Sequence, residues 1–258
     1  MPSSDLLRIG CVKYLNARPL IHGWPGEILF DHPAKLCEKL AAGALDVALA
    51  SSFEFLWNPS YILVDDISIS SHGPVHSVFL AHSGALAEIE EIEVDPASLT
   101  SVNLLRCLLA EAKLSPKLVA RTRLIQRAIT PKLAKFFIGN QAIRFRDENA
   151  GNFQFWDLGD QWRKMTGLPF VYALWLIRPE VMSPKPIADS LRACRDENFR
   201  NLGPLIAAEQ EFSAEFCAYY FNDCIRYGFG PGEKEGLWTF RKLCEKHGLL
   251  SPDPRFVL

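Results

Sequence analysis

Strands and helices alternate along this sequence in two successive blocks, and this alternation constrains the fold more than any other feature. In the first block, apolar runs at residues 7–12 and 45–50 predict strands, and the amphipathic stretch 33–43 between them predicts a helix. A second block starts with a predicted helix at 102–112, followed by a predicted buried strand at 134–138. Because this alternation builds parallel sheets with helices on both faces, we expect an α/β protein with two sheets.

The division into two blocks predicts two lobes with a ligand cleft between them. A chain of 258 residues is long for one compact core and sufficient for two lobes. We expect residues 95–177 to form the second lobe, with the charged stretch 144–154 as a surface loop. Residues 1–94 and 178–258 are expected to form a discontinuous first lobe that ends in helices. Ligands of such sheets bind beyond the carboxyl ends of the strands, so the cleft is the expected binding site.

Composition and charge limit the classes of function. The 28 Lys and Arg residues against 30 Asp and Glu residues give a net charge of −2, which argues against nucleic-acid binding. No apolar stretch approaches the ~18 residues of a membrane span, and the first residues lack the pattern of a secretory signal. The seven cysteines include no CxxC pair, which is typical of reduced thiols. We therefore expect a cytoplasmic protein.

The sequence lacks the common catalytic signatures. It contains neither GxGxxG nor GxxxxGKS/T for phosphates, no HExxH or GxSxG, and no cluster of His, Cys and Asp at ligand spacing. We therefore expect neither a metal site nor a nucleotide cofactor. What remains is a set of polar side chains at predicted strand ends and helix starts. They are Tyr14, Asn16, Ser51, Ser52, His72, Ser77, Ser98, Thr100, Ser101, Asn140 and Gln141.

Several of these side chains form a candidate carboxylate site. Hydroxyl and amide donors at a helix N-terminus suit a carboxylate, because the donors and the helix dipole point the same way. Ser98, Thr100 and Ser101 stand at the start of the predicted helix, where they either cap it or contact a ligand. Asn16 has the same two interpretations, because it can also cap a short helix predicted over residues 17–23.

Nine short stretches, in order and spread over nearly the whole chain, resemble one known family. They are IGCV at 9–12, YLNARPL at 14–20, GALDVAL at 43–49, GPVHSV at 73–78, SLTSV at 98–102, DLG at 157–159 with TGLPFV at 166–171, and GL at both 236–237 and 248–249. Each stretch alone is weak evidence, but together they resemble the chorismate dehydratase family of the futalosine route to menaquinone.

The resemblance implies a periplasmic-binding-protein-like fold of type II, with two crossover segments between the lobes. It also implies loss of water from chorismate to give 3-[(1-carboxyvinyl)oxy]benzoate without a cofactor. The family's motif Asn falls on Asn16, the candidate catalytic residue, and its motif Ser falls on Ser77. Ser77, Thr100 and Ser101 are then expected to hold a substrate carboxylate. Because no obvious protein base emerges from these motifs, the substrate's own enolpyruvyl carboxylate is expected to take the proton.

Three positions depart from the family pattern. Asn140 stands where Asp is usual, Leu99 where Arg or a similar polar residue is common, and Lys13 where Ser or Pro is usual. An amide in place of an acid removes a possible proton acceptor. Two alternatives therefore stay open, a non-catalytic binding protein for a small aromatic carboxylate and a related lyase with a different substrate. In every case the expected partner is a small molecule, bound by a monomer or homodimer.

Overall fold

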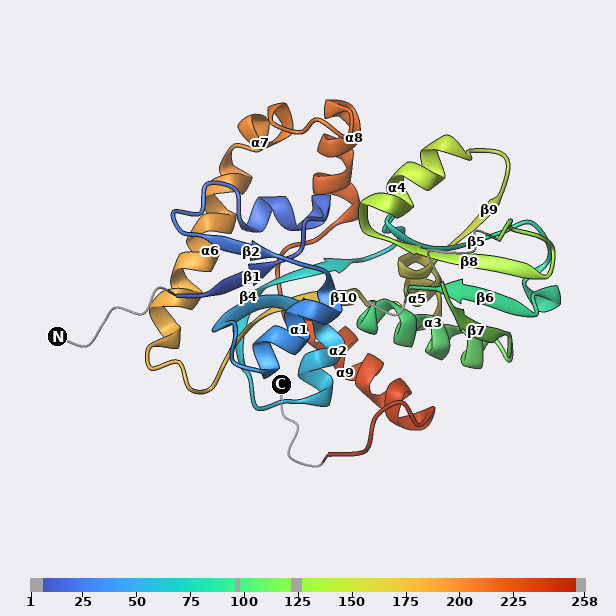
Figure 1. The fold of residues 1–258 in the computed structure, drawn as a ribbon, viewed down its shortest axis with the longest axis horizontal. Helices are drawn as coiled ribbons and strands as arrows, with labels where there is room; N and C mark the ends of the chain where they lie inside the picture. The colour runs from blue at the N-terminus through green and yellow to red at the C-terminus, as the bar shows by residue number, and fades with distance from the viewer. Residues whose placement is uncertain (1–6, 96–97, 122–126, 254–258) are drawn as a thin grey trace.

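The computed structural model describes residues 7–95, 98–121 and 127–253, which form two five-stranded sheets lying side by side (Figure 1). The first sheet has the strand order β2-β1-β3-β10-β4. Its strands are β1 (Ile9–Cys11), β2 (Ile28–Phe30), β3 (Val47–Ser51), β4 (Ile62–Ser71) and β10 (Phe170–Ile177). The second sheet has the order β7-β6-β8-β5-β9. Its strands are β5 (Val78–His82), β6 (Glu91–Val94), β7 (Lys117–Ala120), β8 (Leu133–Ile138) and β9 (Gln154–Asp157).

The chain passes between the sheets twice, at residues 72–77 and 158–169. The sheets therefore divide the strands differently from the predicted boundaries after residues 94 and 177. Strands β5 and β6, predicted in the first lobe, pair within the second sheet, and β10, predicted in the second lobe, lies in the first sheet. Strand partners decide this division, and strand partners leave no local mark in the sequence.

Both sheets are mixed, whereas parallel sheets were predicted. Strand β10 runs antiparallel to β3 and β4, and β5 runs antiparallel to β8 and β9. Each of these two strands begins where the chain arrives from the other sheet, so it runs away from the junction while its neighbours run toward it. A central strand is apolar on both faces in either direction, so its composition does not reveal its direction.

Helices cover the outer faces of the sheets. They are α1 (Pro33–Ala41), α2 (Ser52–Trp57), α3 (Leu99–Glu111), α4 (Gly139–Glu148), α5 (Leu158–Thr166), α6 (Pro184–Arg200), α7 (Gly203–Ala207), α8 (Ala214–Tyr219) and α9 (Pro231–Lys246), with 3₁₀ turns η1 (Leu15–Leu20) and η2 (Leu86–Glu88) and a π-helical turn η3 (Tyr220–Cys224). The surface loop predicted at 144–154 is wrong in its first half, which continues α4. That helix buries Ala142 and Ile143 on one face, and this apolar contact outweighs its polar composition. No helix in the described ranges is long and apolar enough to span a membrane.

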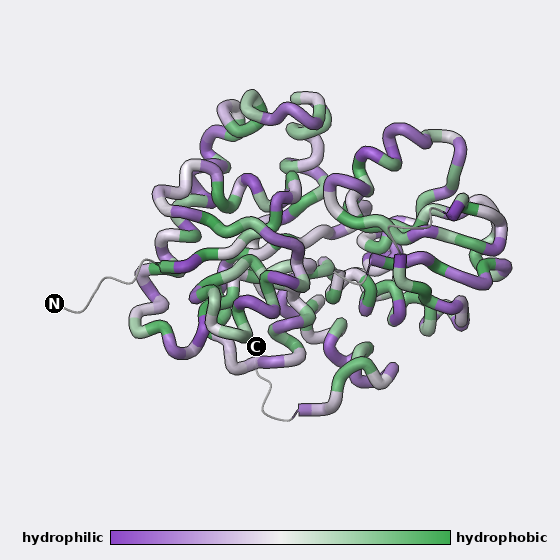
Figure 2. Tube along the Cα trace, viewed as in Figure 1, coloured by the Kyte–Doolittle hydropathy of each residue, from purple (hydrophilic) through white to green (hydrophobic). Residues whose placement is uncertain are grey.

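An aromatic cluster fills the junction between the sheets. The rings of Trp162, Phe170 and Phe240, from α5, β10 and α9, lie 4.9 to 6.2 Å apart and are fully buried. Burial of each such side chain contributes ~1.5–3 kcal/mol. Apolar residues concentrate inside both lobes, as Figure 2 shows. The seven cysteines are all free thiols, and six of them are buried.

Candidate active site

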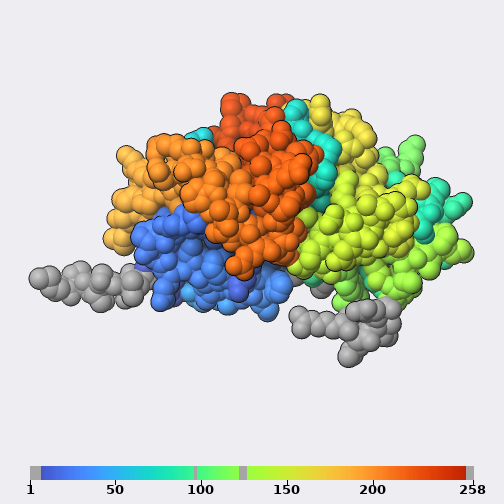
Figure 3. All heavy atoms as spheres, turned by 90° about the horizontal axis from the view of Figure 1, so that it is seen from above, coloured from blue at the N-terminus to red at the C-terminus, as the bar shows by residue number. Residues whose placement is uncertain are grey.

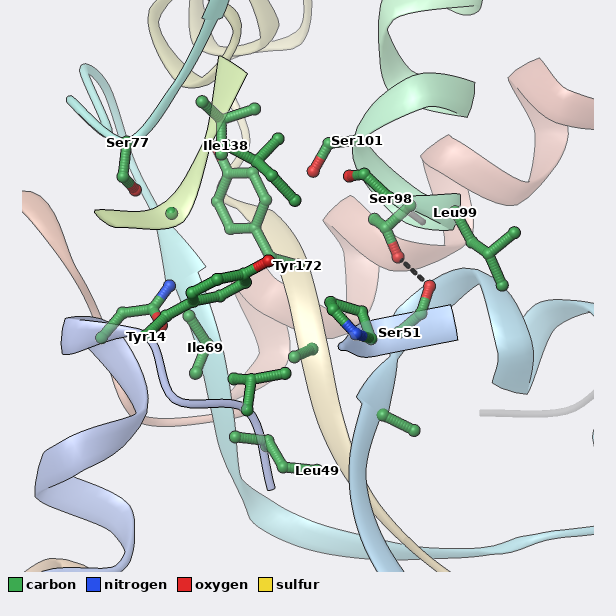
Figure 4. A pocket seen from close by; sticks show the side chains of 18 of the residues that line it. Tyr14, Leu49, Ser51, Ile69, Ser77, Ser98, Leu99, Ser101, Ile138 and Tyr172 are labelled. Carbon is green, nitrogen blue, oxygen red and sulfur yellow. Dashed lines mark hydrogen bonds between the residues drawn. The ribbon is translucent and has the colours of Figure 1, made fainter. Parts of the chain in front are cut away.

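A cavity lies where β3 and β4 end, α3 begins and the crossover 72–77 passes (Figure 4). The walls are largely apolar, with Leu49, Ile69, Val75 and Ile138 among them. None of the described lining residues is Asp, Glu, Lys, Arg or His. The cavity thus combines an apolar interior with hydroxyl and amide groups, and its described lining offers no carboxylate or imidazole that could act as a base.

The structure brings together seven of the eleven polar residues singled out in the sequence. Those that line the cavity are Tyr14, Asn16, Ser51, Ser77, Ser98, Thr100 and Ser101. Ser52 and Asn140 do not line it, and neither do His72 and Gln141, which contact the Gly167 carbonyl and Arg121. Residues 14–16, 51, 77 and 98–101 are far apart in the sequence, and the two sheets place them around one space.

Asn16 has an unpaired polar atom at the cavity. Its Oδ1 is buried and has no hydrogen-bond partner among the described residues. An unpaired buried acceptor costs ~1–3 kcal/mol, and a ligand donor removes that cost. The alternative role as helix cap is wrong, because Tyr14 occupies the N-cap position and Asn16 lies inside η1.

Tyr14 reaches from the first sheet to the start of α4. Gly139, the first residue of α4, has a φ of +61°, and a Cβ placed there would lie 2.7 Å from the Tyr14 ring. Only glycine therefore permits this approach between the lobes. Burial, and secondarily the Asp95 carboxylate, raises the pKa of Tyr14 to about 12. Its hydroxyl consequently stays protonated at neutral pH.

Ser51 and Thr100 join the end of β3 to the first turn of α3. Their hydroxyl oxygens lie 2.5 Å apart, as the dashed line in Figure 4 marks. Thr100 also accepts a hydrogen bond from the Phe53 backbone N–H at 3.1 Å. The Ser52 hydroxyl lies 3.3 Å from Thr100 and donates to the Val171 carbonyl at 2.7 Å. Ser52 is therefore engaged within the protein, while Ser51 and Thr100 hydrogen-bond each other and both line the cavity.

The N-terminus of α3 faces the cavity without a side-chain cap. Ser98 occupies the N-cap position and makes no side-chain capping hydrogen bond, contrary to the capping interpretation of its hydroxyl. Ser98 and Ser101 lie on the same side of the cavity in Figure 4. A helix N-terminus with free backbone donors attracts a negative charge, so this end of the cavity suits a carboxylate.

The crossover 72–77 carries Ser77 to the opposite side of the cavity. The buried carboxylate of Asp157 accepts hydrogen bonds from the backbone N–H groups of Val75 and His76 at 2.9 to 3.2 Å. It also caps α5. His76 has a φ of +60°, a strained conformation for a residue other than glycine, and these bonds help to offset its cost of ~1–3 kcal/mol.

Two tyrosines at the site were not predicted from the sequence. Tyr172 of β10 lines the cavity, although its place in an apolar strand favoured a core role, and its hydroxyl lies 3.1 Å from Ser71 Oγ. Tyr220 donates a hydrogen bond to Ser77 Oγ at 2.6 Å. No local signal marks Tyr220, because it lies in a helical segment more than a hundred residues away.

Comparison with known proteins assigns the family. Residues 7–246 match the family described as menaquinone biosynthesis, which covers nearly the whole chain. The chain belongs to the menaquinone biosynthesis family. It is 31% identical over 219 residues to the chorismate dehydratase of Thermus thermophilus, a match that covers 78% of this chain and 80% of the relative. The family resemblance recognised in the sequence motifs is thereby confirmed.

Solved structures confirm the fold of this menaquinone biosynthesis family member. An Archaeoglobus fulgidus protein superposes with a TM-score of 0.71 at 17% identity, over 96% of this chain and 100% of that chain. The periplasmic aliphatic sulphonate binding protein of Escherichia coli superposes with a TM-score of 0.59 at 13% identity, over 95% and 88% of the two chains. A Candida albicans protein with the generic periplasmic-binding-protein fold gives a TM-score of 0.62 at 9% identity, over 96% and 92%. The periplasmic-binding-protein-like fold is therefore confirmed.

Proposed function

We propose that this protein removes water from chorismate to give 3-[(1-carboxyvinyl)oxy]benzoate, as a carbon–oxygen lyase. The observation that carries the proposal is a largely apolar cavity whose described lining offers hydroxyl and amide donors but no acid or base. Its position in a chain related to a chorismate dehydratase supports the choice of substrate. A cyclic diacid with an apolar ring and a hydroxyl group matches this lining, because donors at two ends hold its polar groups while the ring contacts the walls.

The proposed elimination needs no cofactor because it is redox-neutral. The ring carbon that bears the enolpyruvyl ether loses its proton, the new double bond completes the aromatic ring, and the neighbouring hydroxyl leaves. The substrate's enolpyruvyl carboxylate takes the proton, and the leaving hydroxide takes a proton in turn and departs as water. A cavity without a protein base in its described lining supports this route, since the substrate then has to supply the base. Closure around the substrate holds its carboxylate near the ring proton.

Each polar residue takes a role that matches its contacts. Asn16 binds the leaving hydroxyl through its unpaired side chain. Ser98 and Ser101 at the start of α3 hold a substrate carboxylate, and Ser77 binds the opposite end of the substrate. Thr100, expected to bind the carboxylate directly, acts instead by holding Ser51. Tyr14 and Tyr172 enclose the ring.

The test is turnover of chorismate by the purified protein, followed through the absorbance and mass of the benzoate product. The wild type is expected to form product, and Asn16→Ala is expected to lower kcat by at least ~100-fold because it removes a contact to the reacting hydroxyl. Ser190→Ala is a matched control, because among the described residues its hydroxyl bonds only the Pro186 carbonyl, on the exposed face of α6.

The alternatives make different predictions in the same assay. Tight binding of chorismate by the wild type without any product would overturn the proposal and assign a binding protein, a role performed by the structural relative of Escherichia coli. A wild type that neither binds nor converts chorismate would overturn it in favour of a different substrate.

A further inference from the structure

Ser77 and Tyr220 form a buried hydroxyl pair behind the cavity. Tyr220 Oη lies 2.6 Å from Ser77 Oγ and donates its hydrogen to it. Both side chains are almost fully buried, with 0% of Ser77 and 1% of Tyr220 exposed. The pair joins the crossover 72–77 to the first residue of η3, so it connects a segment between the sheets to the C-terminal helices.

The hydrogen bond between the two hydroxyl groups decides whether Ser77 can donate a hydrogen bond to the cavity. A tyrosine hydroxyl has one hydrogen, and Tyr220 gives it to the Ser77 oxygen. The hydrogen of the Ser77 hydroxyl is then left without a partner among the described residues, and Ser77 lines the cavity. In Figure 4, Ser77 lies across the cavity from Ser98 and Ser101. Ser77 can therefore offer the cavity a hydrogen-bond donor.

The surroundings of Tyr220 keep this arrangement rigid. Its ring stacks on Phe216 with centroids 5.5 Å apart and planes inclined by 16°. The preceding Tyr219 places its hydroxyl 3.0 Å from His76 Nε2, so two consecutive tyrosines bind two consecutive residues of the crossover. Burial raises the pKa of Tyr220 above its usual range, so the hydroxyl remains a donor at neutral pH. Interruptions of helical geometry such as this π-turn often occur at functional sites.

We propose that Tyr220 is a positioning residue, which holds the Ser77 hydroxyl with its hydrogen directed at a negatively charged oxygen of the bound ligand. This inference rests on the proposed function for the identity of the ligand, chorismate. A donor held in place before the substrate binds needs no reorganisation when negative charge develops on the substrate, and so it lowers the barrier. Without Tyr220, the Ser77 hydroxyl rotates freely and donates in other directions.

The test is a double-mutant cycle on turnover and binding of chorismate. Tyr220→Phe is expected to lower kcat/KM by ~10-fold, and Ser77→Ala by more. The double variant is expected to be no worse than Ser77→Ala alone, because the tyrosine acts only through the serine. Tyr227→Phe is the matched control, since Tyr227 is a buried tyrosine of the same region whose hydroxyl has no partner among the described residues. It is expected to change kcat/KM by less than ~2-fold.

The outcomes separate this inference from the proposed function. If the wild type binds chorismate without turnover, the proposed activity is wrong. The double-mutant cycle is then calculated from the dissociation constants of chorismate instead of from kcat/KM. If Tyr220→Phe matches Tyr227→Phe, or if its effect adds to that of Ser77→Ala, the inference is overturned. Should Tyr220→Phe fail to fold, Phe216→Leu replaces it, because it loosens the Tyr220 ring and leaves both hydroxyls in place. An unchanged kcat/KM in Phe216→Leu would then overturn the inference.

Discussion

The Asn140 side chain donates a hydrogen bond to the Glu211 carboxylate at 2.7 Å. Its Oδ1 accepts the Leu15 backbone N–H at 2.8 Å, so Asn140 ties α4 both to the Tyr14–Asn16 turn and to the segment before α8. Arg144, one turn further along α4, pairs with the same carboxylate. In Figure 3 the segment around α8 lies against α4. Asn140, predicted to bind substrate, instead holds the lobes together beside the cavity.

Asn140→Asp is expected to weaken this connection, because it places a second carboxylate against Glu211 and removes the amide donor. We predict a several-fold rise in KM, corresponding to ~1 kcal/mol for a partly exposed pair. Adding Glu211→Gln restores a donor opposite the new carboxylate and is expected to return KM to within ~2-fold of the wild type. The measurement is steady-state turnover of chorismate by the single variants, the double variant and the wild type. A double variant no better than Asn140→Asp would contradict this role for the pair.

Gly139→Ala is expected to destabilise the protein more than an ordinary glycine replacement. The alanine would have to keep a positive φ, and its Cβ would also lie 2.7 Å from the Tyr14 ring. Gly151→Ala is the control, because Gly151 also has a positive φ but nothing lies within 4 Å of its added Cβ. We predict that Gly139→Ala loses ~1–3 kcal/mol more unfolding free energy than Gly151→Ala, measured by urea denaturation. Equal losses would show that Tyr14 does not confine this position.

The kcat/KM for chorismate should neither rise nor fall with pH near neutrality. The ionisable side chains among the described lining residues are Tyr14 and Tyr172, and burial raises the pKa of both, that of Tyr14 to about 12. Both therefore stay protonated, and kcat/KM is expected to be constant from about pH 6 to about pH 9. Measurement across this range tests the absence of a protein base. A bell-shaped profile centred near pH 7 would point to a catalytic group outside the cavity lining.

Acid destabilisation should depend in part on His76. Burial, and secondarily the nearby Arg146, lowers the pKa of His76 below its usual value, which Asp157 partly opposes. The unfolded chain therefore binds a proton more readily than the folded protein once the pH falls below about 6.5, and the unfolding free energy decreases there. His76→Gln is expected to reduce this slope. Urea denaturation at several pH values measures it, and an unchanged slope would refute this assignment.

Thr100→Val and Ser101→Ala should separate a structural from a ligand-binding hydroxyl in the same helical turn. Thr100→Val leaves the buried Phe53 N–H and Ser51 without their partner, so we predict a loss of ~1–3 kcal/mol of unfolding free energy. Ser101→Ala removes a hydroxyl with no partner among the described residues and is expected to change stability by less than ~0.5 kcal/mol. It should nevertheless weaken chorismate binding, measured by calorimetry. The reverse pattern would exchange the two roles.

Much of the secondary structure could be predicted because local pattern decides it. The apolar run at 45–50 forms the buried strand β3 and the Pro33 stretch forms a helix, because a continuous apolar run and helix-starting residues act over a few positions. The helical first half of 144–154 was harder to predict, because the buried Ala142 and Ile143 just before it decide the helix. The direction of β10 and the sheet membership of β5 were not accessible, since both depend on where distant strands lie.

The sequence by itself determined the class of fold, the family and the polar residues that gather at the cavity, because periodicity and motif order survive without knowledge of contacts. Only the tertiary structure decided which of those residues line the cavity and which hydrogen-bond within the protein. Asn140 is engaged by Glu211 outside the cavity, Thr100 lines the cavity but is engaged by Ser51, and Asn16 keeps an unpaired oxygen. Tyr220 became visible only through its contact with Ser77. A hydrogen bond between residues 143 positions apart is a property of packed space, and no local pattern records it.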